Sequence, residues 1–263
     1  MPGGPDRYAT YVASGEYRTS RVTKARVIAH LCGDYLRAPA RVADLGSGTG
    51  LVKRELELIA QNKMLGIELD RSFMEDSSRT LQADATRLPI RSGGLDFVLL
   101  NHVYEHVGDQ VALFAEAYRV LARGGRAYVA AGSRLAIIEP HYRLPFLSWL
   151  PARTAGSYLR RSGRGTTYDG IHFLTYRPLR QRMRSAGFVV HDITERAIDE
   201  LIDTTWGRGW GGLWRLLGML PGKLRSSLLR SLSPQWFFLL EKPGGAPGRE
   251  GNEEREKVRG DGP

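Results

Sequence analysis

The chain contains one cysteine and no long apolar run, and both scarcities limit what it can be. The single Cys32 cannot form an intramolecular disulfide, which indicates a reducing compartment. No apolar run approaches the roughly 20 residues of a membrane-spanning helix, and the first residues lack the basic and apolar regions of a secretory signal. The six histidines show no metal-site spacing with cysteine or paired carboxylates. We therefore expect a cytoplasmic protein without a resident metal ion.

Acidic residues are fewer than basic ones, and two long stretches of the chain contain no acidic residue at all. The chain has 28 Asp and Glu against 38 Lys and Arg, a formal net charge of +10. No acidic residue lies between Glu139 and Asp169 or between Asp203 and Glu241, where arginines alternate with tryptophan, leucine and phenylalanine. Such composition on short helices is typical of membrane-surface contact, here at the inner face. It also suits RNA binding, through charge and stacking.

Short apolar strands alternate with helical patterns through the first half of the chain. The patterns predict strands at 41–45, 64–69, 81–83, 95–100 and 126–131, and helices at 23–36, 51–60 and 110–121. This rhythm implies right-handed crossovers and a doubly wound α/β sheet. A helix at 175–186 and strands near 187–190 and 235–240 extend the pattern.

The most informative motif is the glycine-rich turn VADLGSGTG, residues 42–50, between a strand and a helix. Its glycines allow a tight turn and a close backbone approach to a ligand. The spacing is G-x-G-x-G, unlike the G-x-G-x-x-G of dinucleotide sites, and Asp44 just before it favours a cationic, amine-bearing ligand over a phosphate. Glu68 lies 22 positions after Gly46, at a strand end where a carboxylate can accept two ribose hydroxyls.

Four motifs in order resemble the class I S-adenosylmethionine-dependent methyltransferases, in particular the type 11 methyltransferase domains. They are VADLGSGTG, LGIELD, QADATRLPI and LDFVLLNHVYEHVGD, followed by VLARGGRAYVA, and the resemblance covers residues 22–133. It implies a Rossmann-like, mostly parallel seven-stranded sheet with an antiparallel last strand, helical cap insertions, and S-adenosyl-L-methionine as the cofactor. The implied fold agrees with the strand and helix pattern.

The resemblance also implies a set of cofactor-binding residues at the carboxyl ends of the first four strands. Asp44 would reach the amino group of the methionine part, Glu68 the ribose, and Asp84 the adenine amino group. The full set is Asp44, Gly46, Ser47, Gly48, Glu68, Leu69, Asp84, Ala85 and Asn101. Ligands of open α/β sheets bind beyond this edge.

A base that takes a proton from the acceptor is expected among the histidines. His102 and His106 follow the fourth strand, and a histidine titrates near neutral pH. His141 and His172 lie in the region after the fifth strand, where the family places its acceptor pocket, and are alternatives. Each of the four also has a purely structural interpretation.

We expect a single methyltransferase domain over residues 1–241, with cofactor-binding core 22–133, cap insertions 139–175 and 196–233, and a disordered tail 242–263. The predicted function is methyl transfer to a small-molecule or lipid-linked acceptor, with contact at the membrane surface. Two alternatives remain: an RNA or protein methyltransferase, and a cofactor-binding interaction protein without catalysis. Nucleic acid is the less favoured partner, because no appended RNA-binding module is recognisable.

Overall fold

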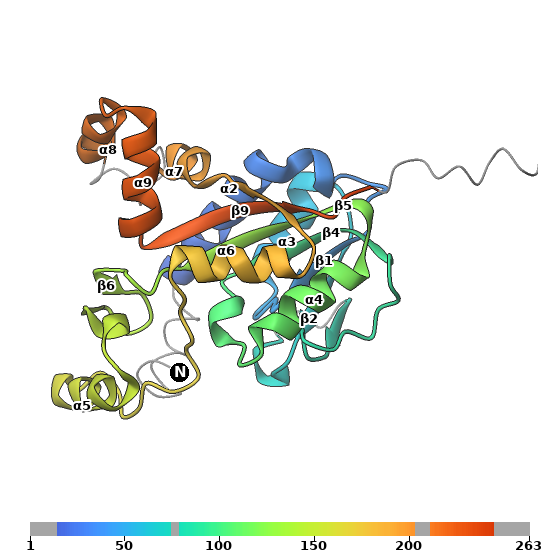
Figure 1. Ribbon diagram of the computed structural model, residues 1–263. Helices are drawn as coiled ribbons and strands as arrows, with labels where there is room; N and C mark the ends of the chain where they lie inside the picture. The colour runs from blue at the N-terminus through green and yellow to red at the C-terminus, as the bar shows by residue number, and fades with distance from the viewer. Residues whose placement is uncertain (1–14, 75–78, 203–210, 245–263) are drawn as a thin grey trace, which may run out of the picture.

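The computed structural model describes residues 15–74, 79–202 and 211–244, and its centre is a seven-stranded sheet of order β3-β2-β1-β4-β5-β9-β8 (Figure 1). Only β9 runs antiparallel to its neighbours within this sheet. The sheet therefore has the predicted architecture. Its strands are β1 (Val42–Leu45), β2 (Met64–Glu68), β3 (Thr80–Gln82), β4 (Leu95–Asn101), β5 (Leu121–Gly132), β8 (Val189–Asp192) and β9 (Gln235–Glu241).

Helices cover both faces of the sheet, which explains the apolar run of its central strand. Along β4, Phe97 and Leu99 pack into a core with α2 (Gly15–Leu36), α3 (Leu51–Ala60) and α7 (Thr194–Ile202). Val98 and Leu100 point the other way, into a core with α4 (Gln110–Val120) and α6 (Tyr176–Ser185). A parallel strand buried on both faces reads as continuous hydrophobic sequence, because neither face is left for polar residues.

The first helix begins at Gly15, earlier than the predicted start at Thr23. Its added turns are polar, and of their side chains Tyr17 and Ser20 are buried. The added turns therefore lack the regularly spaced apolar residues by which a helix is recognised in a sequence. For this reason the sequence pattern did not predict them.

The first insertion, residues 139–175, forms a small layer with its own core. It contains β6 (Ile138–Glu139), β7 (Leu144–Pro145), the 3-10 helix η3 (Leu147–Trp149) and α5 (Ala152–Ser162). Its core consists of Tyr142, Leu144, Leu147, Ala155 and Leu159. Phe173 belongs instead to the core of the sheet, so the end of the insertion is anchored there.

The second insertion, residues 196–233, begins within α7 and continues through α8 (Gly211–Gly218) and α9 (Gly222–Leu232). Ala197 of α7 is buried against α2, so the beginning of this segment covers the sheet. Glu195 accepts hydrogen bonds from Arg225 at 2.6 Å and Ser226 at 2.8 Å, which hold α9 to α7. Of the predicted disordered tail, residues 245–263 lie outside the described part of the chain.

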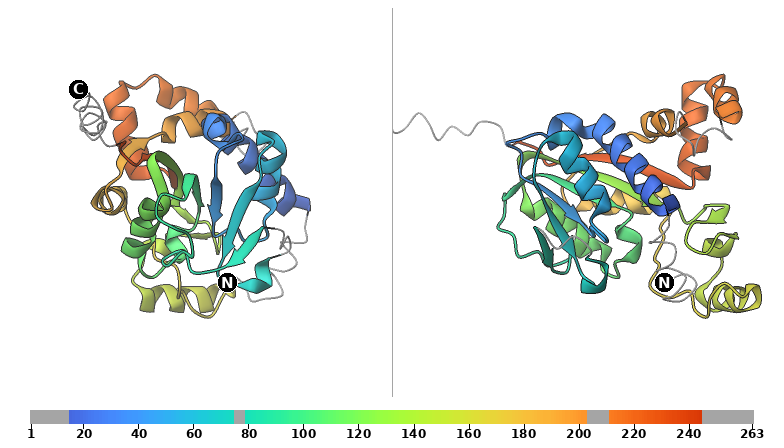
Figure 2. Two further views of the ribbon diagram at one scale, coloured as in Figure 1. Left: turned by 90° about the vertical axis from the view of Figure 1, so that its right-hand side faces the viewer. Right: turned by 180° about the vertical axis from the view of Figure 1, so that it is seen from behind.

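Both insertions lie at the same end of the molecule (Figures 1 and 2). The first follows the carboxyl end of β5 and the second precedes the antiparallel β9, and the backbone N–H of Ser133 donates to the carbonyl of Pro234 at 2.9 Å. They therefore flank the edge where the parallel strands end. Within the described ranges, no helix is long and apolar enough to cross a membrane.

Candidate functional site

The glycine-rich loop between β1 and α3 adopts backbone conformations that its glycines make possible. Gly46, Gly48 and Gly50 have φ values of 68°, 54° and 75°. A Cβ on Gly46 would lie 2.8 Å from Cγ2 of Val103, just beyond the end of β4. Glycine is thus required at position 46, both for its φ and for the close approach of the next strand's loop.

Two carboxylates stand beside this loop at the ends of adjacent strands. Asp44 is buried at 3% exposure, and burial together with the charge of Glu68 raises its pKa to about 7, against the opposing effect of Lys53. Glu68 accepts hydrogen bonds from the backbone N–H groups of Gly48 at 2.8 Å and Asp70 at 3.0 Å. A ligand cation placed here would stabilise the ionised form of Asp44.

The remaining predicted cofactor residues lie along the same edge. Ser47 has a buried hydroxyl with no hydrogen-bond partner among the described residues, and a polar ligand could satisfy it. Leu69 is 63% exposed after β2, as a side chain that packs on a ring would be. Asp84 accepts from the backbone and hydroxyl of Thr86, both at 2.8 Å, which fixes the turn after β3. Ala85 and Asn101 are half-buried.

The residues of this site fit S-adenosylmethionine. A glycine cradle, an orphaned hydroxyl and a carboxylate with a raised pKa form a site that suits a ligand with an ammonium group, a carboxylate and a ribose. The individual contacts stay predictions.

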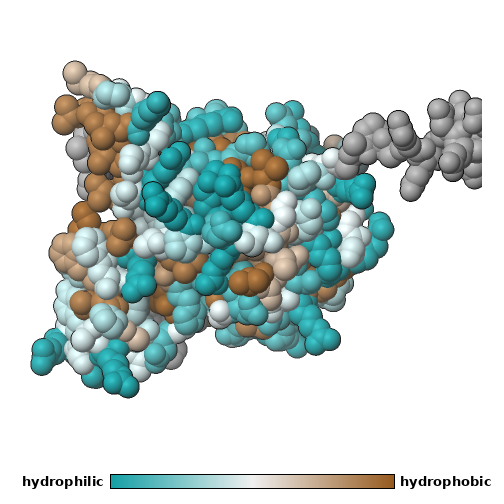
Figure 3. Space-filling model, in the orientation of Figure 1, coloured by the Kyte–Doolittle hydropathy of each residue, from teal (hydrophilic) through white to brown (hydrophobic). Residues whose placement is uncertain are grey.

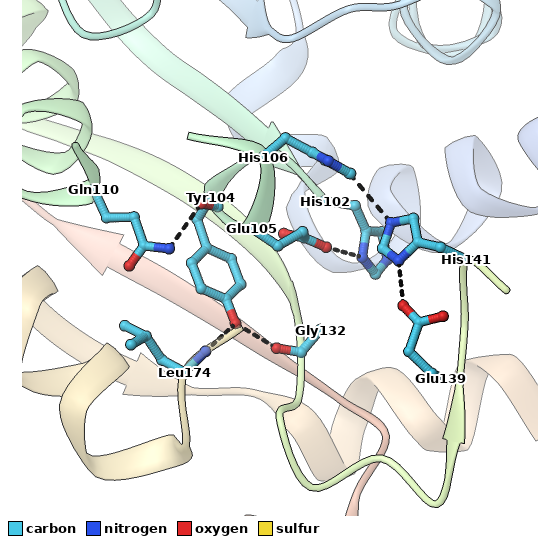
Figure 4. A network of polar contacts seen from close by, with 9 residues as sticks. All are labelled: His102, Tyr104, Glu105, His106, Gln110, Gly132, Glu139, His141 and Leu174. Carbon is cyan, nitrogen blue, oxygen red and sulfur yellow. Dashed lines mark hydrogen bonds and ion pairs between the residues drawn. The ribbon is translucent and has the colours of Figure 1, made fainter. Parts of the chain in front are cut away.

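His102 lies at the end of β4 in a left-handed conformation, with a φ of 60°. Its Nδ1 is 3.1 Å from Oε1 of Glu105, a buried carboxylate on the 3-10 helix η2 (Tyr104–His106) (Figure 4). Burial and then the positive charge of Lys24 lower the pKa of His102 to about 4. His102 is therefore neutral at physiological pH and a weak base.

His106 and His141 meet across the boundary between core and first insertion. Their Nε2 atoms are 3.2 Å apart, and Nδ1 of His141 is 2.7 Å from Oε1 of Glu139 (Figure 4). The sequence predicts these two histidines as separate candidates and does not single out Glu139. The available signal was an acid two positions before a histidine at the edge of an otherwise acid-free stretch. No group of three or more potential metal ligands occurs in the described part of the chain.

The hydroxyl of Tyr104 ties η2 to both β5 and the first insertion. It donates to the carbonyl of Gly132 and accepts from the backbone N–H of Leu174 at 3.2 Å (Figure 4). His172 contributes through its backbone, which donates to the carbonyl of Glu105 at 2.7 Å, while its side chain is exposed. The structure thus brings His102, His106 and His141 to one edge and leaves the His172 ring facing outward.

Comparison with known proteins identifies a matching family and related sequences. The family described as "Methyltransferase domain" matches residues 43–129. Demethylmenaquinone methyltransferase of Thermus thermophilus is 30% identical over 145 residues, covering 46% of this chain and 64% of that protein. Ubiquinone/menaquinone biosynthesis C-methyltransferase of Desulfotalea psychrophila is 26% identical over 166 residues, covering 57% and 65%. The chain thus matches slightly less than two thirds of the length of each of these two relatives.

Solved structures share the fold at low sequence identity. A S-adenosylmethionine-dependent methyltransferase from Archaeoglobus fulgidus has a TM-score of 0.55 at 14% identity, covering 90% of this chain and 99% of that one. The [4+2]-cyclase SpnF has a TM-score of 0.52 at 17% identity, covering 85% and 82%. Because a cyclase shares the fold, these likenesses establish architecture and not reaction. Residues 43–129 thus match the methyltransferase-domain family, and the strand order is that of the class I S-adenosylmethionine-dependent methyltransferase fold.

Proposed function

We propose that the chain transfers a methyl group from S-adenosylmethionine to a small-molecule or lipid-linked acceptor. The observation that carries this proposal is that β1 and β4 are neighbours in the sheet, so that the glycine-rich loop after β1 meets the segment after β4 that carries the histidines. The loop brings Asp44, the orphaned hydroxyl of Ser47 and, from β2, Glu68. These residues suit the cofactor, and the histidines suit an acceptor that must lose a proton. Their proximity supports methyl transfer over cofactor binding alone.

The cofactor would be held by the loop and strand ends already described. Asp44 would bind the ammonium group, Ser47 would donate to the carboxylate of the methionine part, and Glu68 would accept from the ribose hydroxyls. When bound, the cofactor supplies an activated methyl group, so the protein mainly aligns donor and acceptor for in-line displacement. Leu69, Asp84 and Ala85 would border the adenine.

Among the candidate bases, the geometry favours His106 over His102. The pKa of His102, lowered to about 4 by burial and Lys24, leaves it little tendency to accept a proton. The surrounding protein also lowers the pKa of His106, against the opposing charge of Glu105. The ring of His106 is nevertheless exposed, on η2 just after β4, where the acceptor is expected. A base with an accessible ring nitrogen near the reacting atoms meets the geometric requirement of general-base catalysis.

The relatives support a small-molecule or carrier-linked acceptor. Two of them are named for menaquinone or ubiquinone synthesis and a third, from Legionella pneumophila, for malonyl-[acyl-carrier protein], at 28% identity over 102 residues, 35% of this chain and 36% of that protein. These names refer to quinone synthesis and to a carrier-linked acyl group. We extend only the class, a lipid-like or carrier-linked small molecule, to this chain.

Contact with an anionic membrane surface belongs to the same proposal. The insertions present exposed apolar side chains at the site's end of the molecule, visible as a brown band over α8, α9 and the β6 region (Figure 3). Exposed arginines and Lys223 accompany them. Apolar and basic side chains together are what an anionic lipid surface recognises. The apolar set is Ile137 and Ile138, just before the first insertion, and Phe146, Trp149, Leu216, Met219, Leu224 and Leu232 within the two insertions.

The deciding experiment is transfer of labelled methyl from S-adenosylmethionine into a cell extract, separated into lipid, small-molecule, protein and RNA fractions. Label in the lipid or small-molecule fraction supports the proposal. Label in RNA or protein would contradict the proposed acceptor class. The basic insertions would then be interpreted as the surface that binds the RNA or protein acceptor. Cofactor binding without label in any fraction favours a non-catalytic cofactor-binding protein.

A further inference from the structure

Glu139 is a fully buried carboxylate, and both of its oxygens accept hydrogen bonds. Oε2 accepts from the backbone N–H of Tyr142 at 2.7 Å, and Oε1 lies 2.7 Å from Nδ1 of His141. A buried carboxylate is costly unless donors satisfy it. The hydrogen of the His141 ring is therefore on Nδ1, where it donates to Glu139, and the neutral ring has its lone pair on Nε2.

The tautomer of His141 determines that of His106. The two Nε2 atoms are 3.2 Å apart, and the rings meet edge to face at 88°. Because Nε2 of neutral His141 accepts, Nε2 of His106 must carry the hydrogen and donate it. That leaves Nδ1 of His106 as the unprotonated nitrogen of an exposed ring.

The surroundings of the pair are suited to moving a positive charge inward. Phe173 packs against the His141 ring at 5.6 Å between centroids, which limits water on that side. The surrounding protein lowers the pKa of His106, the carboxylate of Glu105, on η2, opposes this, the neighbouring His141 lowers the pKa further, and the carboxylate of Glu139, on β6, raises it. Nδ1 of His141 is in direct contact with the carboxylate of Glu139. A proton arriving at His141 would therefore meet a carboxylate in direct hydrogen-bond contact.

We infer that His106, His141 and Glu139 form a proton relay for the acceptor of the proposed methyl transfer, an inference that rests on that proposed function. His106 is the catalytic residue, since its Nδ1 takes the acceptor's proton. His141 takes the proton that leaves Nε2 of His106. Glu139 is a positioning residue that fixes the His141 tautomer and balances its charge.

The atoms and charges of this step balance without a further reactant. The acceptor's O–H or N–H bond breaks towards His106 Nδ1 as the acceptor's electron pair forms the bond to the methyl carbon. The bond between that carbon and sulfur breaks, so the positive charge of the sulfonium disappears while one appears on His141. After the product leaves, His141 returns the proton to Nε2 of His106 and Nδ1 of His106 releases its proton to water, which restores both starting tautomers.

A purely structural interpretation makes different predictions. If the contact only held the first insertion to η2, removing the charge of Glu139 would lower stability without changing the pH dependence of catalysis. The relay requires a change in rate, in pH dependence and in ring tautomer. The test therefore measures all three.

The first measurement is NMR of the parent protein with ¹⁵N-labelled histidine, assigned with His106→Gln and His141→Gln. The relay predicts His141 as the Nδ1–H tautomer, and as a mixture in Glu139→Gln. Finding the Nε2–H tautomer of His141 in the parent overturns the inference whether or not the protein transfers methyl groups.

The second measurement is the pH–rate profile of methyl transfer. Glu139→Gln should lower kcat about 10-fold or more, because an oriented general base contributes about 10²–10⁴-fold. It should move the ascending limb of the profile, leave cofactor affinity unchanged, and be partly rescued in Glu139→Asp. Glu200→Gln is the matched control, since it removes the carboxylate that lies 2.8 Å from His30, between α7 and α2, and should leave the profile unchanged.

The outcomes separate the two proposals. An active parent whose profile is unchanged in Glu139→Gln contradicts the relay and leaves the proposed function standing. A parent that binds the cofactor but transfers no methyl group to any acceptor fraction contradicts the proposed function, and with it the relay.

Discussion

Asp44 is buried and lies near the like-charged carboxylate of Glu68, and both effects raise its pKa. Its carboxyl is 3% exposed and its pKa is raised to about 7, mainly by burial. In the unfolded chain the same group would have a pKa near the ordinary value of 3.8. Between these two pH values the folded protein binds a proton that the unfolded chain has lost. An acid whose folded pKa is raised therefore favours folding at low pH, and that contribution is lost as the pH rises through about 7.

Asp44→Asn should remove this pH dependence, because asparagine keeps the shape of the side chain without the titration. Without cofactor, the free energy of unfolding of Asp44→Asn relative to the parent should rise by about 2–3 kcal/mol between pH 5 and pH 8. Urea unfolding at the two pH values measures it. A constant difference between variant and parent would mean that Asp44 is ionised throughout the range, contrary to its burial.

Cofactor binding should expel the proton of Asp44. At pH 6.5 the carboxyl is largely protonated, and an ammonium group beside it favours the ionised form. Calorimetry of S-adenosylmethionine binding in buffers of different ionisation enthalpy should show proton release in the parent protein. Asp44→Asn should abolish this proton release and weaken the binding free energy by about 1.5–3 kcal/mol. The exposed Asp199→Asn serves as the control. Equal proton release in parent and Asp44→Asn would exclude this residue as the ammonium partner.

At the scale of elements, η2 is the joint between the sheet and the first insertion. The Tyr104 hydroxyl bonds Gly132 at the end of β5 and Leu174 at the end of the insertion, and Gln110 donates to the carbonyls of Tyr104 at 3.0 Å and His172 at 2.7 Å. One short 3-10 helix thus fixes the insertion relative to the row of histidines. The position of His141 opposite His106 depends on this joint.

Tyr104→Phe should loosen the joint without altering the loop that holds the cofactor. It leaves a backbone carbonyl and a backbone N–H without their partner, at a cost of about 1–3 kcal/mol in the free energy of unfolding. Hydrogen exchange of the amides at 172–174 should accelerate, while affinity for S-adenosylmethionine stays within about twofold. Tyr158→Phe, on α5, is the matched control. Unchanged exchange at 172–174 in Tyr104→Phe would show that the hydroxyl does not hold the insertion.

The elements that sequence reasoning found are those whose causes are local. The turn around Gly46 could be predicted because the strand, the positive-φ glycines and the following helix are contiguous, and Glu68 follows at a fixed distance along the chain. The pairing of His106 with His141 could not, because it joins residues 35 positions apart through the tertiary contacts of η2. Glu139 looked like the border of a basic stretch because its burial is set by the packing of the insertion.

The whole molecule is polarised, with the candidate site and both insertions at one end (Figures 1 and 2). The same end carries exposed apolar side chains, including Met219 at 81% and Leu216 at 61% exposure. A lipid-linked acceptor held in a bilayer could reach the site only if this end faces the membrane. The location of the apolar and basic surface therefore agrees with the acceptor class that we propose.

This arrangement predicts binding to anionic vesicles through α8 and the turn that follows it. The parent protein should sediment with vesicles of phosphatidylcholine and phosphatidylglycerol at low salt. The double variant Leu216→Glu, Met219→Glu should bind these vesicles about 10-fold or more weakly, because two large apolar side chains no longer insert into the lipid. Leu58→Glu with Ile59→Glu makes the same charge change at exposed positions on α3, outside both insertions, and should bind like the parent apart from the shared effect of added negative charge. If all three proteins bind equally and salt removes each of them, charge alone holds the protein to the vesicle. If the parent does not bind at all, the acceptor must reach the site from solution, and the exposed apolar side chains of the insertions would need another partner.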